Sequence, residues 1–311
     1  MATSLKGKDI INTKELSVEE INLIMDTAAK YERIMDEGGR LLNMSGKILC
    51  TFFYEASTRT RLSFETAMLR LGGTVVSVAA ATTSSSAKKG ETVFDTGKMV
   101  QAYSDVTVIR HPTVGSAKEL ADGSSVPVIN GGDGAGQHPT QSLLDMYTIL
   151  KEKGKVEGLT VALAGDLKNG RTVHSLSQLL SRFGVKFYFV APKALAMPEE
   201  ITKELRAKGV QITETEDIME AVPNCDVLYM TRIQAERFED PAEYEKYRNA
   251  YVVTMDTVKK AKKGMIIMHP LPRVNEIAVE VDAYEGAAYF RQAANGVPTR
   301  MALLALVCGQ E

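Results

Sequence analysis

The 311-residue chain lacks the features of a disulfide-stapled, membrane-bound or nucleic-acid-binding protein. Its three cysteines, Cys50, Cys225 and Cys308, are far apart without ligand-like spacing, which indicates small buried thiols in a reducing compartment rather than disulfides or zinc ligands. A net charge of −2 gives no electrostatic argument for a nucleic-acid or anionic-membrane partner. No N-terminal segment resembles a signal peptide, and no apolar run is long enough to span a bilayer. We therefore expect a soluble, cytoplasmic protein.

Two motif classes are also missing. No Gly-x-Gly-x-x-Gly follows a strand-like run, which argues against a nucleotide-binding dehydrogenase, and no glycine-rich loop ends in Gly-Lys-Ser/Thr. The four histidines are too scattered to form a convincing metal site. His111 and His269 each precede a proline, and we expect structural roles for both.

Apolar runs of strand length alternate with helical patterns along nearly the whole chain. This alternation predicts an α/β fold with mostly parallel sheets flanked by helices, and the length favours two domains. A Ser-x-x-Glu capping box at Ser17 and Glu20 predicts where the first long helix begins. The expected strands are 48–53, 74–78, 106–109, 126–129, 160–163, 187–190, 227–230 and 265–268, and the expected helices are 17–35, 92–104, 140–151, 172–182, 199–207 and 297–307.

Polar residues follow the first expected strand directly. Ser57, Thr58, Arg59 and Thr60 lie between this strand and a helical pattern, where free N–H groups, hydroxyls and a guanidinium suit an oxyanion such as phosphate. An ordinary N-cap with a solvated arginine explains the same residues equally well, so this junction alone leaves both interpretations open.

Other strand ends repeat the pattern. Because ligands in open α/β sheets bind beyond the carboxyl ends of the strands, arginine, histidine, glutamine and threonine at six such ends indicate a binding site. The segments concerned are 57–60, 110–112, 131–141, 165–171, 231–234 and 269–273.

These motifs, together with Lys88-Lys-Gly-Glu91, resemble the transcarbamoylase family, and its aspartate branch in particular. The match runs in order from about residue 45 to the C-terminal helix. The resemblance implies a carbamoyl phosphate-binding domain of residues 1–150 plus about 290–311, and an aspartate-binding domain of residues 151–289. It further implies that the C-terminal helix packs back on the first domain.

The resemblance also implies a reaction. The carbamoyl group of carbamoyl phosphate would pass to the amine of L-aspartate, the committed step of de novo pyrimidine synthesis, with no metal and no cofactor. Arg59, Thr60, Arg110 and His138 would be catalytic. The implied ligands of carbamoyl phosphate are Ser57, Thr58, Arg59, Thr60, Arg110, His138, Gln141, Leu271, Pro272 and, from the neighbouring chain, Ser85. The implied ligands of aspartate are Arg171, Arg232, Gln234 and, from the neighbouring chain, Lys89.

Residues 79–89 lack apolar periodicity, so we expect this segment to stay out of its own domain's core. In the family this loop reaches into the site of the neighbouring subunit, which implies a homotrimer with shared active sites. Separate regulatory chains are a further candidate partner that the sequence does not decide.

Two other functions compete with this one. One is a transcarbamoylase for another acceptor such as ornithine. A cationic acceptor calls for acidic or neutral groups and commonly a cysteine in the His269-Pro-Leu-Pro-Arg273 motif, which has none. The other is a catalytically silent assembly protein on the same fold. Such a protein would have no physical reason to keep five polar donors that we expect to be buried: Thr60, Arg110, His138, Arg171 and Arg232.

Overall fold

A computed structural model of the chain describes residues 3–84, 86–234, 238 and 240–311. It divides into two compact units: unit 1 is Met1–Tyr147 with Asn295–Glu311, and unit 2 is Thr148–Ala294. Among the described residues, no helix is both long and apolar enough to cross a membrane.

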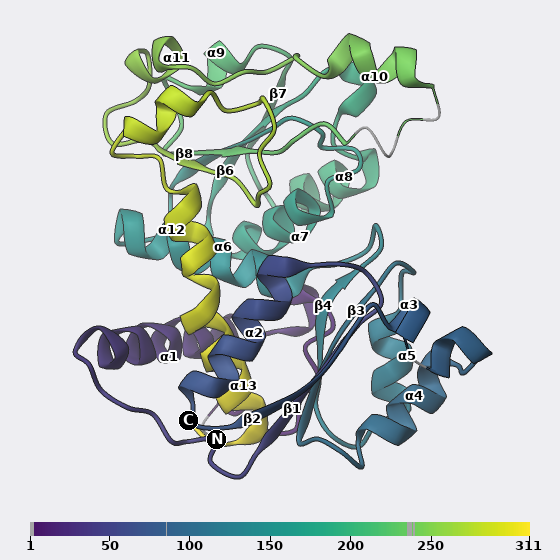
Figure 1. Ribbon diagram of the computed structural model, residues 1–311. Helices are drawn as coiled ribbons and strands as arrows, with labels where there is room; N and C mark the ends of the chain where they lie inside the picture. Colours follow the sequence, from purple (N-terminus) through teal and green to yellow (C-terminus); the bar gives the residue numbers. More distant parts are fainter. Residues whose placement is uncertain (1–2, 85, 235–237, 239) are drawn as a thin grey trace. The chain divides into compact units, whose positions relative to one another are not determined.

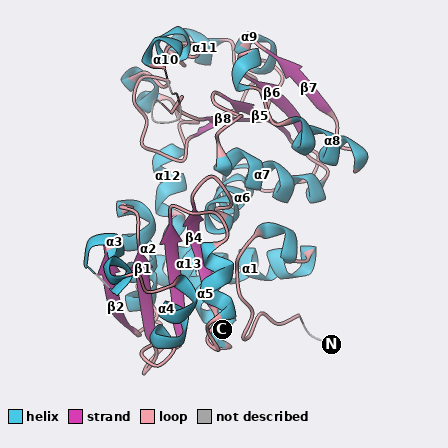
Figure 2. Ribbon diagram, turned by 90° about the vertical axis from the view of Figure 1, so that its right-hand side faces the viewer, coloured by secondary structure: helices cyan, strands magenta, loops and turns pink. Residues whose placement is uncertain are grey.

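Unit 1 is built on a four-stranded parallel sheet in the order β2-β1-β3-β4. Figure 2 shows the strands of this sheet as magenta arrows. The inner strands are largely buried, whereas the edge strand β2 is largely exposed. All four strands were expected from the sequence, to within a few residues at their ends. Their bounds are β1 (Ile48–Phe53), β2 (Thr74–Ala79), β3 (Val106–His111) and β4 (Val128–Asp133).

Helices cover both faces of this sheet. Figure 1 shows α1, α2 and the yellow α13 on one side, and α4 and α5 on the other. The C-terminal helix α13 is buried on nearly all sides and packs against α1 and α2, which confirms its expected return to the first domain. The helices are α1 (Val18–Asp36), α2 (Thr58–Arg70), α3 (Ala81–Ser84), α4 (Val93–Val100), α5 (Ser116–Asp122), α6 (Pro139–Lys153), α13 (Gly296–Cys308) and two 3₁₀ turns, Thr13–Glu15 and Ser86–Lys89.

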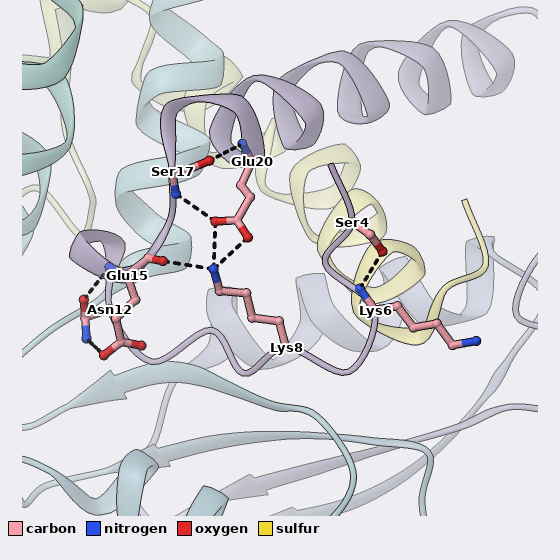
Figure 3. A network of polar contacts seen from close by, with 7 residues as sticks. All are labelled: Ser4, Lys6, Lys8, Asn12, Glu15, Ser17 and Glu20. Atoms are coloured by element: carbon pink, nitrogen blue, oxygen red, sulfur yellow. Dashed lines mark hydrogen bonds and ion pairs between the residues drawn. The ribbon is translucent and has the colours of Figure 1, made fainter. Parts of the chain in front are cut away.

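The N-terminal segment is tied to α1 by the network in Figure 3. The predicted capping box is present: the Glu20 amide donates to Ser17 Oγ at 3.2 Å, and the Ser17 amide donates to Glu20 Oε2 at 2.7 Å. Lys8 Nζ donates to both carboxylate oxygens of Glu20 at 2.7 Å. The next residues then lie along β4, with a parallel bridge between Ile10 and Ile129, so they cover the free edge of that strand.

Unit 2 contains a five-stranded parallel sheet in the order β7-β6-β5-β8-β9. Figure 1 shows α7 and α8 on one side of it and α9 and α11 on the other. The strands are β5 (Thr160–Ala164), β6 (Lys186–Val190), β7 (Ile212–Thr215), β8 (Val227–Met230) and β9 (Ile266–Met268). The helices are α7 (Arg171–Leu180), α8 (Glu199–Ala207), α9 (Ile218–Ala221), α10 (Pro241–Tyr247), α11 (Met255–Lys259), α12 (Tyr289–Ala294) and 3₁₀ turns at Ser181–Phe183, Lys193–Leu195 and Val279–Ala283.

The parallel α/β fold is thus confirmed, and several details differ from expectation. Strand β7 and the short helices α3, α5, α9, α10, α11 and α12 were not predicted, and α4 ends at Val100 instead of continuing to residue 104. The expectation that residues 79–89 stay out of the core is wrong at Ala81. This residue is fully buried with Val78 and Val93 in an apolar cluster, because a short helix turns its methyl group inward.

Candidate functional site

Each sheet has one point where the strand order reverses, and the predicted site residues gather there. In unit 1 the reversal lies between β1 and β3; Ser57 follows β1 and Arg110 lies near the end of β3. In unit 2 it lies between β5 and β8, which are followed by Arg171 and Arg232 respectively. In open parallel sheets such reversal points are where ligands bind.

The N-terminus of α2 is available to an anion. Ser57 is the N-cap residue, yet its side chain makes no capping hydrogen bond, and the first turn contains no acidic residue. The side chains of Thr58 and Arg59 are exposed. An ordinary serine N-cap would bond the third amide of the helix, so the local geometry favours the alternative: a hydroxyl, amides and a guanidinium left free for a phosphate-like group.

Thr60 and Arg110 approach the same glycine, Gly131, within β4. Thr60 is buried, and a Cβ atom placed on Gly131 would lie 3.6 Å from its methyl group. Arg110 Nη1 donates to the Gly131 carbonyl at 3.1 Å, and its Nη2 lies 3.5 Å from Glu55 Oε2. The structure thus places Thr60 and Arg110 beside the same residue, although in the sequence they follow separate strands. Glu55 was not predicted as a site residue; its place two residues after the strand Ile48–Phe53 was the available signal.

His138 is positioned by a folded loop between β4 and α6. Asp133, almost fully buried, accepts hydrogen bonds from the amides of Gln137 at 2.6 Å and Gly115 at 2.9 Å. His138 follows this loop, is 5% exposed, and its carbonyl accepts from the Gln141 amide in the first turn of α6. Asp133 is therefore a second supporting residue that the sequence analysis missed.

In unit 2, Arg171 opens α7 after a tightly held loop. Asp166 is fully buried and accepts from the Asn169 amide at 2.9 Å and from its side chain. Gln234 Nε2 lies 3.5 Å from the Asn169 carbonyl, which links the loop after β8 to the loop after β5. Arg171, Arg232 and Gln234 are each partly exposed, so two guanidiniums and an amide of unit 2 stand within reach of solvent-borne carboxylates.

Leu271 and Pro272 follow β9 in a loop that is stabilised by two buried residues, His269 and Glu276. His269 Nδ1 accepts from the Leu271 amide at 2.7 Å, so the proton is on Nε2, which donates to Glu276 Oε1 at 2.6 Å. Leu271 has φ 57° and is joined to Pro272 by a cis peptide bond. The structural role expected for His269 is confirmed.

His111 is likewise structural. Its Nδ1 accepts from the Thr113 amide at 3.0 Å and lies 2.8 Å from Ser116 Oγ, and burial lowers the pKa of its ring.

Lys89 is exposed in the 3₁₀ turn Ser86–Lys89, whereas Ser85 lies outside the described residues. In the described part of the chain, no group of three or more His, Cys, Asp and Glu side chains could hold a metal ion.

The chain is therefore a parallel α/β protein of two compact units, with cationic side chains after the strands at the reversal point of each sheet. The profile described as aspartate/ornithine carbamoyltransferase, carbamoyl-P binding domain, matches residues 8–151, and the profile of the Asp/Orn binding domain matches residues 157–307. The chain belongs to the aspartate/ornithine carbamoyltransferase family.

Individual relatives agree with this assignment. The aspartate carbamoyltransferase catalytic subunit of Thermococcus kodakarensis is 52% identical over 304 residues, which cover 98% of each chain. The aspartate transcarbamoylase of Trypanosoma cruzi, crystallised with carbamoyl phosphate and aspartate, is 44% identical with a TM-score of 0.92 and covers 97% of each chain. The catalytic subunit of M. jannaschii aspartate transcarbamoylase is 49% identical with a TM-score of 0.90, covering 96% of this chain and 98% of that one.

Proposed function

We propose that this chain is an enzyme that transfers the carbamoyl group of carbamoyl phosphate to the amine of L-aspartate, giving N-carbamoyl-L-aspartate and phosphate. This is the committed step of pyrimidine synthesis. The observation that carries the proposal is the pair of cationic sites at the two sheet reversal points. The names of the relatives, and the two substrates named with the T. cruzi structure, support the same reaction.

The residues of unit 1 suit carbamoyl phosphate. The phosphate binds at the N-terminus of α2, where Arg59 stabilises charge on the departing bridging oxygen. Thr60, Arg110 and His138 donate to the carbonyl oxygen, which becomes negative as the amine attacks. Preorganised donors of this kind contribute ~3–4 kcal/mol each to transition-state stabilisation. The NH₂ group of the substrate can only donate, so it pairs with Gln141 Oε1.

The residues of unit 2 suit the remaining groups. Arg171 and Arg232 each offer a planar fork for one carboxylate of aspartate, with Gln234 beside them. The carbonyl oxygens of Leu271 and Pro272 are further acceptors for the carbamoyl NH₂. Residues 1–150 plus about 290–311 then form the carbamoyl phosphate-binding domain, and residues 151–289 the aspartate-binding domain.

Proton transfer in this scheme needs no side-chain base. The departing phosphate has a second pKa near ~6, so its dianion can take the proton that the amine loses on attack. The protein acts by orientation and by charge stabilisation, from which a reaction between two bound substrates gains much.

The test compares two acceptors. Purified protein is supplied with carbamoyl phosphate and with either L-aspartate or L-ornithine, and carbamoyl-aspartate and citrulline are both measured. Turnover with aspartate and none with ornithine supports the proposal. Citrulline as the main product would identify an ornithine-type enzyme, and no product with either acceptor would favour a silent protein on this fold.

The proposal includes a homotrimer in which Ser85 and Lys89 serve the site of the neighbouring chain. It is supported by the exposed position of Lys89, and a threefold ring uses one head-to-tail contact three times. Lys89→Ala chains are mixed with His138→Ala chains, each almost inactive alone, and subunits are exchanged. Mixed trimers contain some sites with neither lesion, so activity should partly return. A mixture that stays inactive despite proven exchange would place Lys89 in its own chain's site.

Two further parts of the proposal concern the surroundings of the enzyme. Separate regulatory chains are candidate partners, supported by the words "catalytic subunit" in the names of the relatives. A cytoplasmic location is supported by Cys50, Cys225 and Cys308, which are all free thiols.

A further inference from the structure

A buried arginine lies behind the candidate carbamoyl site of unit 1. Arg300, on α13, is 3% exposed, and its guanidinium lies 4.9 Å from the centre of the Phe64 ring of α2. Its Nη2 donates to Thr140 Oγ1 at 3.3 Å, in the first turn of α6. Its Nε is buried and has no hydrogen-bond partner among the described residues. A cation held this deeply needs a counter-charge.

Asp145 provides that charge. It is fully buried on α6, and its charge raises the pKa of Arg300, although burial lowers that pKa more, to about 9. One turn earlier on the same face of α6, Gln141 donates from Nε2 to Asp145 Oδ1 at 2.9 Å. The carboxylate therefore interacts both with a buried cation and with the side-chain amide of Gln141.

This contact determines which end of the Gln141 amide is left for a ligand. A carboxylate only accepts hydrogen bonds, so it holds the NH₂ end and leaves Oε1 as the free acceptor. If the amide flipped, its NH₂ would face outward and meet the NH₂ of a carbamoyl group, donor against donor. A neutral side chain at position 145 could accept either orientation.

Gly296 leaves room for the arrangement. A Cβ atom at this position would lie inside the van der Waals distance of Arg300 Nη1. The glycine therefore allows the guanidinium to occupy its place next to the start of α13.

We propose that Asp145 and Arg300 are positioning residues that lock the Gln141 amide with its oxygen outward and so select a carbamoyl over an acyl phosphate. The inference rests on the proposed function, because it assigns the carbamoyl NH₂ to Gln141.

The test measures three dissociation constants by calorimetry: for carbamoyl phosphate, for acetyl phosphate, which carries a methyl group in place of NH₂, and for inorganic phosphate. In Asp145→Asn, carbamoyl phosphate should bind about tenfold more weakly, as expected for one lost hydrogen bond. The other two constants should change less than about twofold, because they do not depend on an acceptor for NH₂. Equal weakening of all three ligands, or unchanged carbamoyl phosphate binding, would overturn the proposal.

Two further variants keep the result decisive if Asp145→Asn folds poorly. Gly296→Ala should displace the Arg300 guanidinium and produce the same selective loss, smaller in size. In a Gln141→Ala background, Asp145→Asn should cause no additional selective loss, since its effect passes through that amide. If the selective losses caused by Gln141→Ala and by Asp145→Asn simply added in the double variant, Asp145 would not act through the Gln141 amide and the proposal would be contradicted.

Asp105→Asn is the matched control. This carboxylate of unit 1 pairs with Lys47 at 2.8 Å and accepts from the Ile48 amide at 2.9 Å, before β3 begins, and should leave the selectivity unchanged. The proposed function fails separately, if the wild-type protein binds no carbamoyl phosphate or forms no carbamoyl-aspartate.

Discussion

Removal of the Glu276 carboxylate should destabilise unit 2 strongly. The carboxylate, 6% exposed, accepts from His269 Nε2 at 2.6 Å and from the amides of Val274 at 3.1 Å and Asn275 at 3.0 Å. Glu276→Ala leaves these donors without their acceptor. Val274 is exposed, so water can accept the hydrogen bond that its amide loses. The imidazole of His269 is only 1% exposed, so no water replaces the acceptor that its Nε2–H loses.

The size of the effect follows from these contacts. An unsatisfied buried donor costs ~1–3 kcal/mol; the Nε2–H of His269 is one such donor and the two amides add part of a second, so about 3 kcal/mol is expected for Glu276→Ala. With a urea slope of ~1–3 kcal/mol per M, the unfolding midpoint should fall by about 1–3 M. Circular dichroism in urea measures this shift, and where the two units unfold in separate steps the shift belongs to the step of unit 2.

The control is Glu245→Ala, which removes a carboxylate 3.0 Å from Arg248 on the exposed surface of the same unit. Such a pair contributes ~0–1 kcal/mol, so its midpoint should hardly move. If Glu276→Ala shifted the midpoint no more than this control, the buried pair would not hold the loop of Leu271 and the reasoning would be refuted.

The pH dependence provides an independent check. Burial raises the pKa of Glu276, but the hydrogen bond and charge of His269 and the backbone amides lower it more, so the pKa lies below its ordinary value of 4.5. A carboxyl group with a lowered folded-state pKa contributes stability that is present above the unfolded-state pKa and is lost as the pH falls through the folded-state pKa. The stability gap between wild type and Glu276→Gln should therefore be constant above about pH 5 and narrow below it.

Four further variants test the site itself. Arg59→Ala should fold normally and lose most of its kcat with little change in KM, as expected for a group that acts on the leaving oxygen; near wild-type turnover would remove it from the catalytic set. Arg171→Ala and Arg232→Ala should each weaken aspartate binding by ~2–5 kcal/mol and leave carbamoyl phosphate binding nearly unchanged, whereas equal loss of both would mean these arginines are misassigned. Gly134→Ala should weaken carbamoyl phosphate binding, because φ is +52° there and a Cβ would collide with the Pro112 carbonyl; unaltered binding by calorimetry would show that the loop before His138 tolerates the change.

Several parts of the fold could be predicted from local patterns because the responsible interactions are local. The capping box of α1 depends on two residues three positions apart, and β1 and β5 are runs of mostly apolar, buried residues. Helix α5 had the same kind of signal, with Ala117, Leu120 and Ala121 buried at helical spacing, but it is only seven residues long. Strand β7 had almost none: its four residues contain one apolar side chain, because it lies at the edge of its sheet.

The supporting residues of the site could not be predicted in this way. Asp133, Asp145 and Arg300 are charged residues on or next to regular elements, and in a sequence such residues indicate a solvated surface. They are buried because partners distant in the sequence compensate them: Arg300 meets Thr140 across 160 positions. The residues proposed to face a ligand were found from their motifs at strand ends, whereas the residues that contact and support them became evident only from the packing.

The two chain segments that form unit 1 are separated by the whole of unit 2. Helix α13 packs against α1 and α2, and Asn43 donates to the Gln310 carbonyl across 267 positions. During synthesis on a ribosome, residues 148–294 can leave the exit tunnel and fold while unit 1 still lacks the helix that fills its core. Contacts between segments so far apart in the sequence form slowly. In each new chain, unit 1 should therefore begin to fold first and be completed last, and the apolar surface that α13 covers should stay exposed until α13 packs against it.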